Sequence, residues 1–328
     1  METLLTVVIA AYNSEKTIER TLQSLLPLVK KGVEVVVIDD GSSDGTYQIA
    51  KDFSRVVDGL KIVSLEHDGS ASARNYGLSM VNTRFVMFCD ADDELLDFDL
   101  NALELLDGDF IVCDYLYKRI NGEIEKVKVS IGESGMRETV FSAELSECLI
   151  GQVGFWRYLY RTDFLKEKSV RFVGQLSELN ADFFVLDDYF FLLHVLSTFE
   201  TCNYWNAAIY KYYENGSANP KRFQKQSKFI CSAATIQIRE VYEKLPKERR
   251  SWYRMELRRQ LFSSFMAVSL KDTYLYWWRF GKAVTGMKTD SLKVTIMRTM
   301  KDWLILLFVV IRKTASTAKS ITKSKILR

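Results

Sequence analysis

The chain has 328 residues, of which 48% are hydrophobic and 27% are charged, which is typical of a globular protein of one or two domains. It contains only two histidines, His67 and His194, so a three-histidine zinc site is excluded and acid–base chemistry falls mainly to carboxylates. Its five cysteines form no Cys-x-x-Cys pair, which predicts reduced thiols in the core of a cytoplasmic protein. GxGxxG and GxxxxGK[ST] motifs are absent, which argues against dinucleotide dehydrogenases and P-loop enzymes.

The net charge of +3 conceals an uneven distribution along the chain. Residues 221–328 contain 25 Lys/Arg and 7 Asp/Glu, whereas residues 1–220 contain 20 Lys/Arg and 35 Asp/Glu. Such asymmetry predicts a basic surface that faces a membrane or a nucleic acid, and an acidic region able to hold a metal ion.

The first 115 residues alternate between the patterns of buried strands and amphipathic helices. A short β-branched apolar run predicts a strand, and apolar residues three and four apart predict a helix. Strands are predicted at 4–10, 33–38, 60–65, 84–88 and 109–114, and helices at 18–26, from Ser43 or Asp44 to about 57, and at 70–80.

This alternation predicts an α/β fold with a parallel sheet and right-handed crossovers. Ligands of such sheets bind at the carboxyl ends of the strands. Polar clusters follow four of the predicted strands, at residues 11–13, 39–41, 67–69 and 90–93. We therefore expect these clusters to meet at one edge of the sheet.

After residue 115 the pattern changes. Asn121-Gly122 lies between two alternating runs and predicts a β-hairpin. From residue 221 onward the chain is basic, aromatic and of helical pattern. The longest apolar run, Trp303 to Ile311, has nine residues, whereas a membrane span needs about 20. A helix lying in the membrane interface is expected instead, and a helical subdomain with a solvated basic face is the alternative.

Several acidic and basic side chains have both a structural and a chemical interpretation. Asp90-x-Asp92-Asp93 can cap a following helix or hold a divalent cation. Asp39-Asp40 can form a turn or accept hydrogen bonds from a base or a ribose. Arg74 can pair with a pyrophosphate or lie on the surface of an ordinary helix.

Asp187-Asp188 opens an apolar helix, where acids usually favour the helix dipole. Beside Phe190 and Phe191, the same carboxylates can acquire the raised pKa of a general base. His194, two turns further along, is predicted to be a packed or capping residue rather than a ligand.

These clusters, in this order, resemble glycosyltransferase family 2, the inverting enzymes of the GT-A fold. The resemblance covers roughly residues 4–220. It is carried by VVIAAYN (7–13), VVVIDDGSSDGT (35–46), DGSASARNYG (68–77), FCDADDEL (88–95), FWRYLYRTDFL (155–165), DDYFF (187–191) and IYKYYENGS (209–217).

The resemblance implies a role for each matching position. The nucleotide would be bound by Ala10, Tyr12, Asn13, Asp39, Asp40, Arg74, Asp90 and Ala91. Asp92, with Asp90, would hold Mn²⁺ or Mg²⁺, and Asp188 would deprotonate the acceptor hydroxyl. Because the segment from Val173 to Leu186 is long for the family, Asp187 is the alternative base. Trp156, Arg157 and Tyr160 would lie near the acceptor.

The resemblance implies a GT-A domain at 1–220, with a nucleotide-sugar half to about 115 and an acceptor half at about 116–220. The basic, helical pattern of residues 221–328 predicts a second region. The expected activity is transfer of a single sugar from a nucleotide sugar to a glycan acceptor. The expected donor is a UDP-sugar. That acceptor is lipid-linked if the basic region docks at the inner face of the cell membrane in cell-surface polysaccharide synthesis. The basic region could instead form a homo-oligomer, and nucleic-acid binding is not favoured. The alternatives are a sugar nucleotidyltransferase and a non-catalytic membrane-docked module of the same fold.

Overall fold

The computed structural model describes residues 3–129, 137–140, 142–150, 154–173, 187–214 and 241–266. The chain divides into two compact units, residues 1–218 with 244–253, and residues 219–243 with 254–328. The candidate site lies in the first unit. Trp303 to Ile311 and the basic tail at 313–328 lie outside the described residues. Among the helices that are described, none combines the length and the apolar character that crossing a membrane requires.

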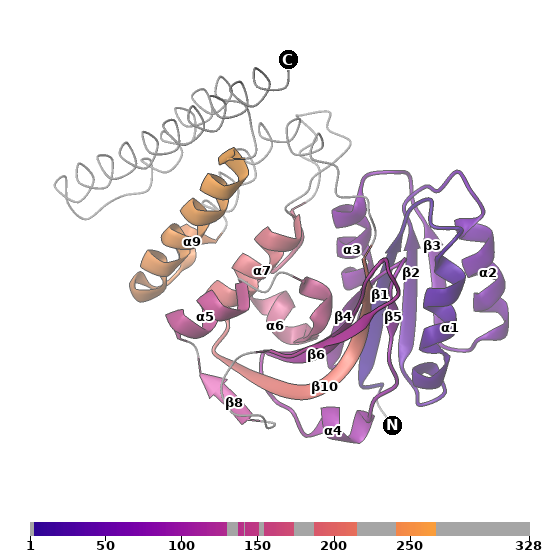
Figure 1. Cartoon of the computed structure of the whole chain (residues 1–328), viewed down its shortest axis with the longest axis horizontal. Helices are drawn as coiled ribbons and strands as arrows, with labels where there is room; N and C mark the ends of the chain where they lie inside the picture. The colour runs from indigo at the N-terminus through magenta and orange to yellow at the C-terminus, as the bar shows by residue number, and fades with distance from the viewer. Residues whose placement is uncertain are drawn as a thin grey trace, which may run out of the picture. The chain divides into compact units, whose positions relative to one another are not determined.

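The N-terminal half of the first unit is a parallel sheet flanked by helices (Figure 1). Its strands lie in the order β3-β2-β1-β4, and each pair of neighbours is parallel. In Figure 1, α1 and α2 lie on one side of this sheet and α3 on the other. The elements are β1 (Leu5–Ala11), α1 (Ile18–Val29), β2 (Glu34–Asp39), α2 (Thr46–Val56), β3 (Leu60–Ser64), α3 (Ser70–Ser79) and β4 (Phe85–Asp90).

The second half extends the same sheet with mixed pairing. The order continues β4-β9-β6-β10-β5, and β9 runs antiparallel to both of its neighbours. The elements are β5 (Glu94–Leu95), α4 (Leu100–Glu104), β6 (Phe110–Lys118), β7 (Ile124–Val127), β8 (Arg137–Val140), α5 (Ala143–Ile150), η1 (Phe155–Arg157), β9 (Tyr158–Arg161), α6 (Thr162–Glu167), α7 (Asp187–Thr198) and β10 (Thr201–Tyr213). Two further elements, η2 (Tyr242–Lys244) and α9 (Lys247–Met266), each include residues of both units.

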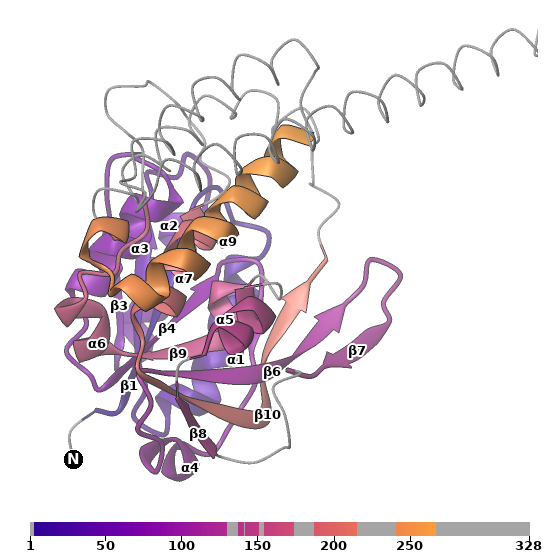
Figure 2. The ribbon, with the colours of Figure 1, turned by 90° about the vertical axis from the view of Figure 1, so that its left-hand side faces the viewer.

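The predicted α/β class is confirmed, and the predicted strands and helices of the first 115 residues are present within a few residues. The helix expected from Ser43 or Asp44 begins at Thr46, whose backbone N–H donates to Asp44 Oδ1 at 3.0 Å. The hairpin predicted at Asn121-Gly122 joins β6 to antiparallel β7, which projects from the sheet in Figure 2.

A close contact between Gly77 and Val8 sets the distance of α3 from the sheet. A Cβ atom on Gly77 would lie 2.4 Å from Val8 Cγ1, so only glycine allows the helix to approach β1 this closely. Val8 is fully buried in the centre of the parallel sheet. Because Arg74 precedes Gly77 by about one helical turn, this packing brings its guanidinium down toward the ends of the strands.

Candidate functional site

The polar clusters that follow the parallel strands do meet at one edge of the sheet. Ala10 pairs with Asp90 across β1 and β4, and Asp39 pairs with Ala11 on one side and with Ser64 on the other. The sequence-based expectation about their meeting is therefore confirmed by the register.

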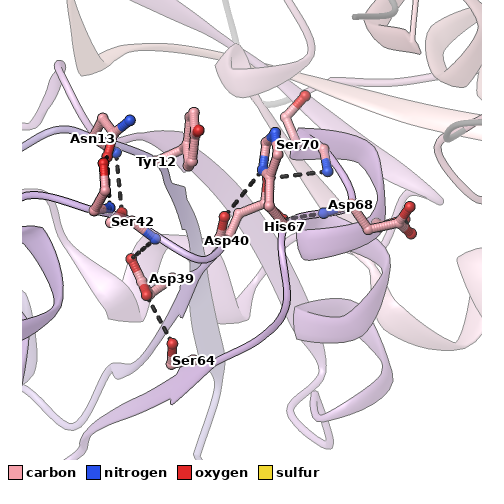
Figure 3. Close-up of polar contacts among 12 residues, drawn as sticks. Tyr12, Asn13, Asp39, Asp40, Ser42, Ser64, His67, Asp68 and Ser70 are labelled. Atoms are coloured by element: carbon pink, nitrogen blue, oxygen red, sulfur yellow. Dashed lines mark hydrogen bonds and ion pairs between the residues drawn. The ribbon is translucent and has the colours of Figure 1, made fainter. Parts of the chain in front are cut away.

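The loop after β1 is joined to the loop after β2 by reciprocal hydrogen bonds (Figure 3). Asn13, in a left-handed conformation at φ 47°, donates its backbone N–H to Ser42 Oγ at 3.0 Å. Its side-chain oxygen accepts from the Ser43 N–H at 2.9 Å. Asp39 is buried, and its carboxylate accepts from Ser64 Oγ at 2.8 Å. Asn13 thus fixes the loops after β1 and β2 to each other, and Asp39 joins the end of β2 to the end of β3.

Asp40 is a buried carboxylate that organises the loop after β3. It accepts from the backbone N–H groups of Asp68 at 2.9 Å and Gly69 at 3.0 Å, and from His67 Nδ1 at 2.8 Å. Gly41 lets this loop approach, because a Cβ atom there would lie 2.9 Å from the His67 backbone nitrogen. Figure 3 shows these bonds converging on Asp40.

Tyr12 presents an aromatic face at the same edge. Its ring is stacked on the His67 imidazole with centroids 4.1 Å apart and planes 12° apart. Both side chains are partly open to solvent, Tyr12 at 43% and the His67 side chain at 35% exposure. The edge therefore carries an aromatic surface beside a carboxylate acceptor.

The end of β4 and the loop after it carry three carboxylates, of which Asp93 is buried and has a structural role, whereas Asp90 and Asp92 are partly exposed. Asp93 is buried, and its carboxylate oxygens bond the Tyr210 hydroxyl at 2.7 Å and the Tyr213 N–H at 2.8 Å. Burial, aided by the charge of Asp90, raises the pKa of Asp93 to about 8. The loop backbone is fixed to α1 by Thr21, whose hydroxyl contacts the Ala91 and Asp93 carbonyls.

Asp90 and Asp92 are the oxygen donors that fit a divalent cation. Both are only partly buried at the end of β4. Among the residues that the structure describes, no group of three or more acidic, histidine or cysteine side chains is gathered as a metal site. One or two carboxylates are nevertheless the usual protein share of a Mg²⁺ site that is completed by substrate phosphates. The donor set therefore fits a hard cation bound together with a diphosphate.

Arg74 is the centre of the site. Its Nη2 lies 2.8 Å from Asp90 Oδ1, and its Nη1 lies 2.9 Å from Asp187 Oδ2 and 3.4 Å from Asp188 Oδ1. The side chain is only 10% exposed. The resemblance places Arg74 near the base or the pyrophosphate of the nucleotide, and this stays a prediction. In this structure its guanidinium bridges the end of β4 and the start of α7.

Two aromatic rings support this guanidinium. Its carbon lies 4.4 Å from the centroid of Phe155 and 5.3 Å from that of Phe172. Phe172 is held by Asn75, whose side-chain amide donates to the Phe172 carbonyl at 2.8 Å and accepts from its N–H at 2.9 Å. Phe172 also stacks on Phe191 of α7, with centroids 4.0 Å apart. The position of Arg74 is therefore fixed by packing as well as by charge.

The carboxyl pair at the start of α7 is electrostatically unusual. Burial raises the pKa of Asp187, although Arg74 opposes the rise. Partial burial and the neighbouring Asp187 raise the pKa of Asp188 well above its usual range. Asp187 is the more enclosed of the two, with side-chain exposure of 7% against 37% for Asp188. Raised carboxyl pKa values suit proton acceptance near neutral pH.

The three residues predicted to lie near the acceptor are packed in the interior. Trp156 stacks on Tyr210, with centroids 4.5 Å apart. Arg157 donates to the Cys113 carbonyl, and the Tyr160 hydroxyl donates to the Phe155 carbonyl at 2.7 Å. The exposures of Trp156, Arg157 and Tyr160 are 7%, 2% and 0%. All three side chains are enclosed by other residues of the protein, and their place near the acceptor stays a prediction.

Sequence reasoning missed three residues at this edge. His67 was noted as part of a polar cluster but given no role, although its place directly after a predicted strand was a sufficient indication. Asn75 and Tyr210 act through contacts with residues 97 and 120 positions away, and no local pattern indicates such contacts.

His194 is buried as predicted, and burial lowers its pKa to about 4.

Comparison with known proteins identifies the family. The family model for glycosyl transferase family 2 matches residues 6–161. The putative glycosyltransferase EpsH of Bacillus subtilis is 24% identical over 76% of this chain and 74% of its own length. An Escherichia coli enzyme, UDP-Glc:alpha-D-GlcNAc-diphosphoundecaprenol beta-1,3-glucosyltransferase WfaP, is 30% identical over 45% of this chain and 57% of its own.

Solved structures show the same fold. S. aureus TarS 1-349 superposes with a TM-score of 0.63 at 21% identity, covering 86% of this chain and 81% of that one. The complex of TarS 1-349 with UDP-GlcNAc gives a TM-score of 0.62 at 21% identity, covering 85% and 80%. A Pyrobaculum calidifontis mannosyltransferase solved with GDP-Man and Mn²⁺ gives 0.50 at 15%, covering 93% and 81%. Residues 6–161 therefore match glycosyltransferase family 2, and the chain has the GT-A fold of glycosyltransferases.

Proposed function

We propose that the protein transfers a single sugar, with inversion, from a UDP-sugar to a hydroxyl of a glycan acceptor. The observation that carries the proposal is the ion-pair network of Arg74. It joins Asp90, at the end of a central strand, to the carboxyl pair Asp187-Asp188. The Arg74 guanidinium thus lies between Asp90, which would contact the donor complex, and the pair Asp187-Asp188, whose pKa values are raised.

The donor side of the site has the chemistry of a nucleotide pocket. Tyr12 offers a ring face for a base, and Asp39 and Asp40 offer carboxylate acceptors beside it. Asn13, Ala10 and Ala91 line the same edge at the ends of β1 and β4. TarS, which shares the fold, has been solved with UDP and with UDP-GlcNAc, and this supports a UDP-sugar as donor.

Asp90 and Asp92 would hold Mn²⁺ or Mg²⁺, which neutralises the charge of a diphosphate leaving group. Arg74 supplies a second positive charge at the same place. Its Nη2 already faces the Asp90 carboxylate at 2.8 Å, so an incoming diphosphate would find the guanidinium at the cation site. This arrangement supports departure of the nucleotide without a protonated leaving group.

Asp188 is the proposed base, and Asp187 the residue that orients Arg74. Asp187 Oδ2 receives both the Arg74 guanidinium at 2.9 Å and the Ser70 hydroxyl at 3.3 Å, so its lone pairs are engaged. Asp188 is more exposed and makes only the longer 3.4 Å contact with Arg74. A carboxylate that can reach solvent while its pKa is raised is suited to take the proton of an attacking hydroxyl.

The experiment that tests this function measures UDP release from UDP-GlcNAc in the presence of Mg²⁺, together with the anomer of the sugar first released to water. The expected product is the β-anomer, because one displacement inverts the α-linked donor. Asp188→Asn should reduce the rate by about 100-fold or more. Asp52→Asn, a substitution in an exposed ion pair with Arg55 on α2, is the matched control and should leave the rate unchanged. An unchanged rate in Asp188→Asn would remove the base assignment.

The acceptor is proposed to be lipid-linked in cell-surface glycan synthesis. WfaP, by its name, acts on a sugar carried by diphosphoundecaprenol, and residues 221–328 of this chain contain 25 Lys/Arg against 7 Asp/Glu. Each basic residue near an anionic bilayer contributes about 1 kcal/mol. The full-length protein should cosediment with anionic vesicles, and the variant with Lys323→Glu, Lys325→Glu and Arg328→Glu should do so less. Equal sedimentation of both would contradict membrane docking by this tail.

A further inference from the structure

We infer that the imidazole of His67 occupies the place of the nucleotide base in the ligand-free protein, and that the donor must displace it. The inference rests on the proposed function, because it takes the edge formed by Tyr12 and Asp40 as the base pocket. It assigns His67 as a residue that selects which base enters.

The imidazole makes the two interactions that a nucleobase would make at this edge. It stacks face to face on Tyr12, with centroids 4.1 Å apart. Its Nδ1 lies 2.8 Å from Asp40 Oδ2 and 3.1 Å from the Asp40 carbonyl oxygen. A carbonyl oxygen is always an acceptor, so Nδ1 carries the hydrogen and donates to Asp40. Uracil is likewise a planar ring, and its N3–H could donate to the same carboxylate.

The two rings leave no room for a base between them. Stacking a base between Tyr12 and His67 would need about twice the observed separation of 4.1 Å. A base that uses both the Tyr12 face and the Asp40 carboxylate must therefore take the position that the imidazole now holds.

The backbone of the loop can stay in place while the side chain leaves. Asp40 holds the N–H groups of Asp68 and Gly69 at 2.9 and 3.0 Å, and Gly41 packs against the His67 backbone. In contrast, the imidazole stacks on Tyr12 and bonds Asp40, and 35% of the side chain is exposed. Rotation about the side-chain bonds of His67 therefore frees the pocket without remodelling the loop.

This arrangement selects among bases by the hydrogen at the ring nitrogen. Uracil and thymine carry an N–H at N3, which can replace the Nδ1–H of His67 on Asp40. Cytosine carries a lone pair at N3, which would face the carboxylate, and Asp40 would lose the bond that His67 now supplies. We therefore expect UDP and dTDP, but not CDP, to displace the imidazole.

The experiment follows the His67 ring by NMR during titration of the full-length protein with UDP and Mg²⁺. Since the chain contains two histidines, the His67→Asn variant assigns the ring resonances. Stacking on Tyr12 should shift the His67 Hε1 or Hδ2 resonance upfield in the free protein. The Tyr12→Ala variant is the control, because it should lack this upfield shift. Saturation with UDP should remove the shift in the same way, and CDP at the same concentration should not.

Calorimetry supplies the second readout. His67→Ala should bind UDP about fivefold more tightly than the natural protein, since about 1 kcal/mol of competing hydrogen bond is removed. UDP that binds by calorimetry while the His67 resonances stay upfield would overturn the inference and leave the proposed function standing. Weaker UDP binding by His67→Ala would also overturn it, because His67 would then be a wall of the pocket. Failure of UDP, dTDP and GDP to bind at all would overturn both.

Discussion

Arg74 Nη1 lies 2.9 Å from Asp187 Oδ2, although the two residues are 113 positions apart in the chain. Arg74 belongs to α3, on one side of the parallel sheet, and Asp187 is the first residue of α7. Since Arg74 Nη2 also bonds Asp90 at the end of β4, one guanidinium connects two helices and a central strand. The geometry of the proposed donor and base sites therefore depends on one side chain.

Arg74→Ala is expected to destabilise the protein by about 3 kcal/mol, because removing one member of a buried ion pair leaves the other without compensation. Asp187, only 7% exposed, is the residue left behind. Arg74→Lys should recover part of the stability but little activity, because a single ammonium cannot donate to Asp90 and Asp187 in the same way as the planar fork. Urea unfolding and UDP-release rates measure the two effects.

The control for that substitution is Arg55→Ala. Arg55 pairs with Asp52 at 2.8 Å, but both side chains are more than half exposed, and such pairs contribute about 0.5 kcal/mol or less. Equal destabilisation by Arg55→Ala and Arg74→Ala would contradict the central role of Arg74.

Asn75→Ala should lower stability by about 2 kcal/mol, because two backbone groups of Phe172 lose their partners. Since Phe172 supports both Arg74 and Phe191, the substitution should also reduce kcat more than it raises the KM for the donor. Ser79→Ala, on the same helix but in an exposed position, should change neither quantity. A stable Asn75→Ala protein with full kcat would show that this support is dispensable.

His194 predicts a pH dependence of stability. Burial, followed by the positive charge of Lys244, lowers its pKa to about 4 in the folded protein, against about 6.5 in an unfolded chain. Between these values the unfolded state binds more protons, so the free energy of unfolding should fall as pH falls from 6.5 to 4, by at most about 1.4 kcal/mol per unit.

His194→Gln removes this titration and should flatten the stability profile between pH 6.5 and 4. The measurement is urea unfolding of both proteins across that range. Identical slopes for the two proteins would mean that His194 is protonated in the fold, in disagreement with its 6% exposure.

Local patterns were sufficient to predict the parallel half of the fold. Apolar β-branched runs such as Val35 to Ile38 are buried on both faces of the sheet, which is why periodicity and length identified them. The edge where the polar clusters meet follows from the rule that parallel strands end at the same side. The positions of Asp39, Asp40 and Asp90 were therefore predictable in outline.

The contacts within the site were not predictable, because they depend on the mixed half of the sheet. Strand β9 inserts antiparallel between β4 and β6, and no turn pattern indicates this insertion. It helps to place Phe155 beneath Arg74. Likewise, the sequence alone does not distinguish Asp93 from the nearby Asp90 and Asp92. In the structure Asp93 differs from them because the Tyr210 hydroxyl, on β10, donates to its carboxylate at 2.7 Å. Long-range packing, rather than local propensity, gives each carboxylate its environment.

Metal-dependent donor binding is tested by calorimetric titration of the protein with UDP in Mg²⁺, repeated in EDTA and with Asp92→Asn and Asp188→Asn. We expect UDP binding that is lost in EDTA, weakened by Asp92→Asn and retained by Asp188→Asn, because Asp188 acts on the acceptor hydroxyl and not on the donor. Absence of binding for UDP, dTDP and GDP alike would contradict it.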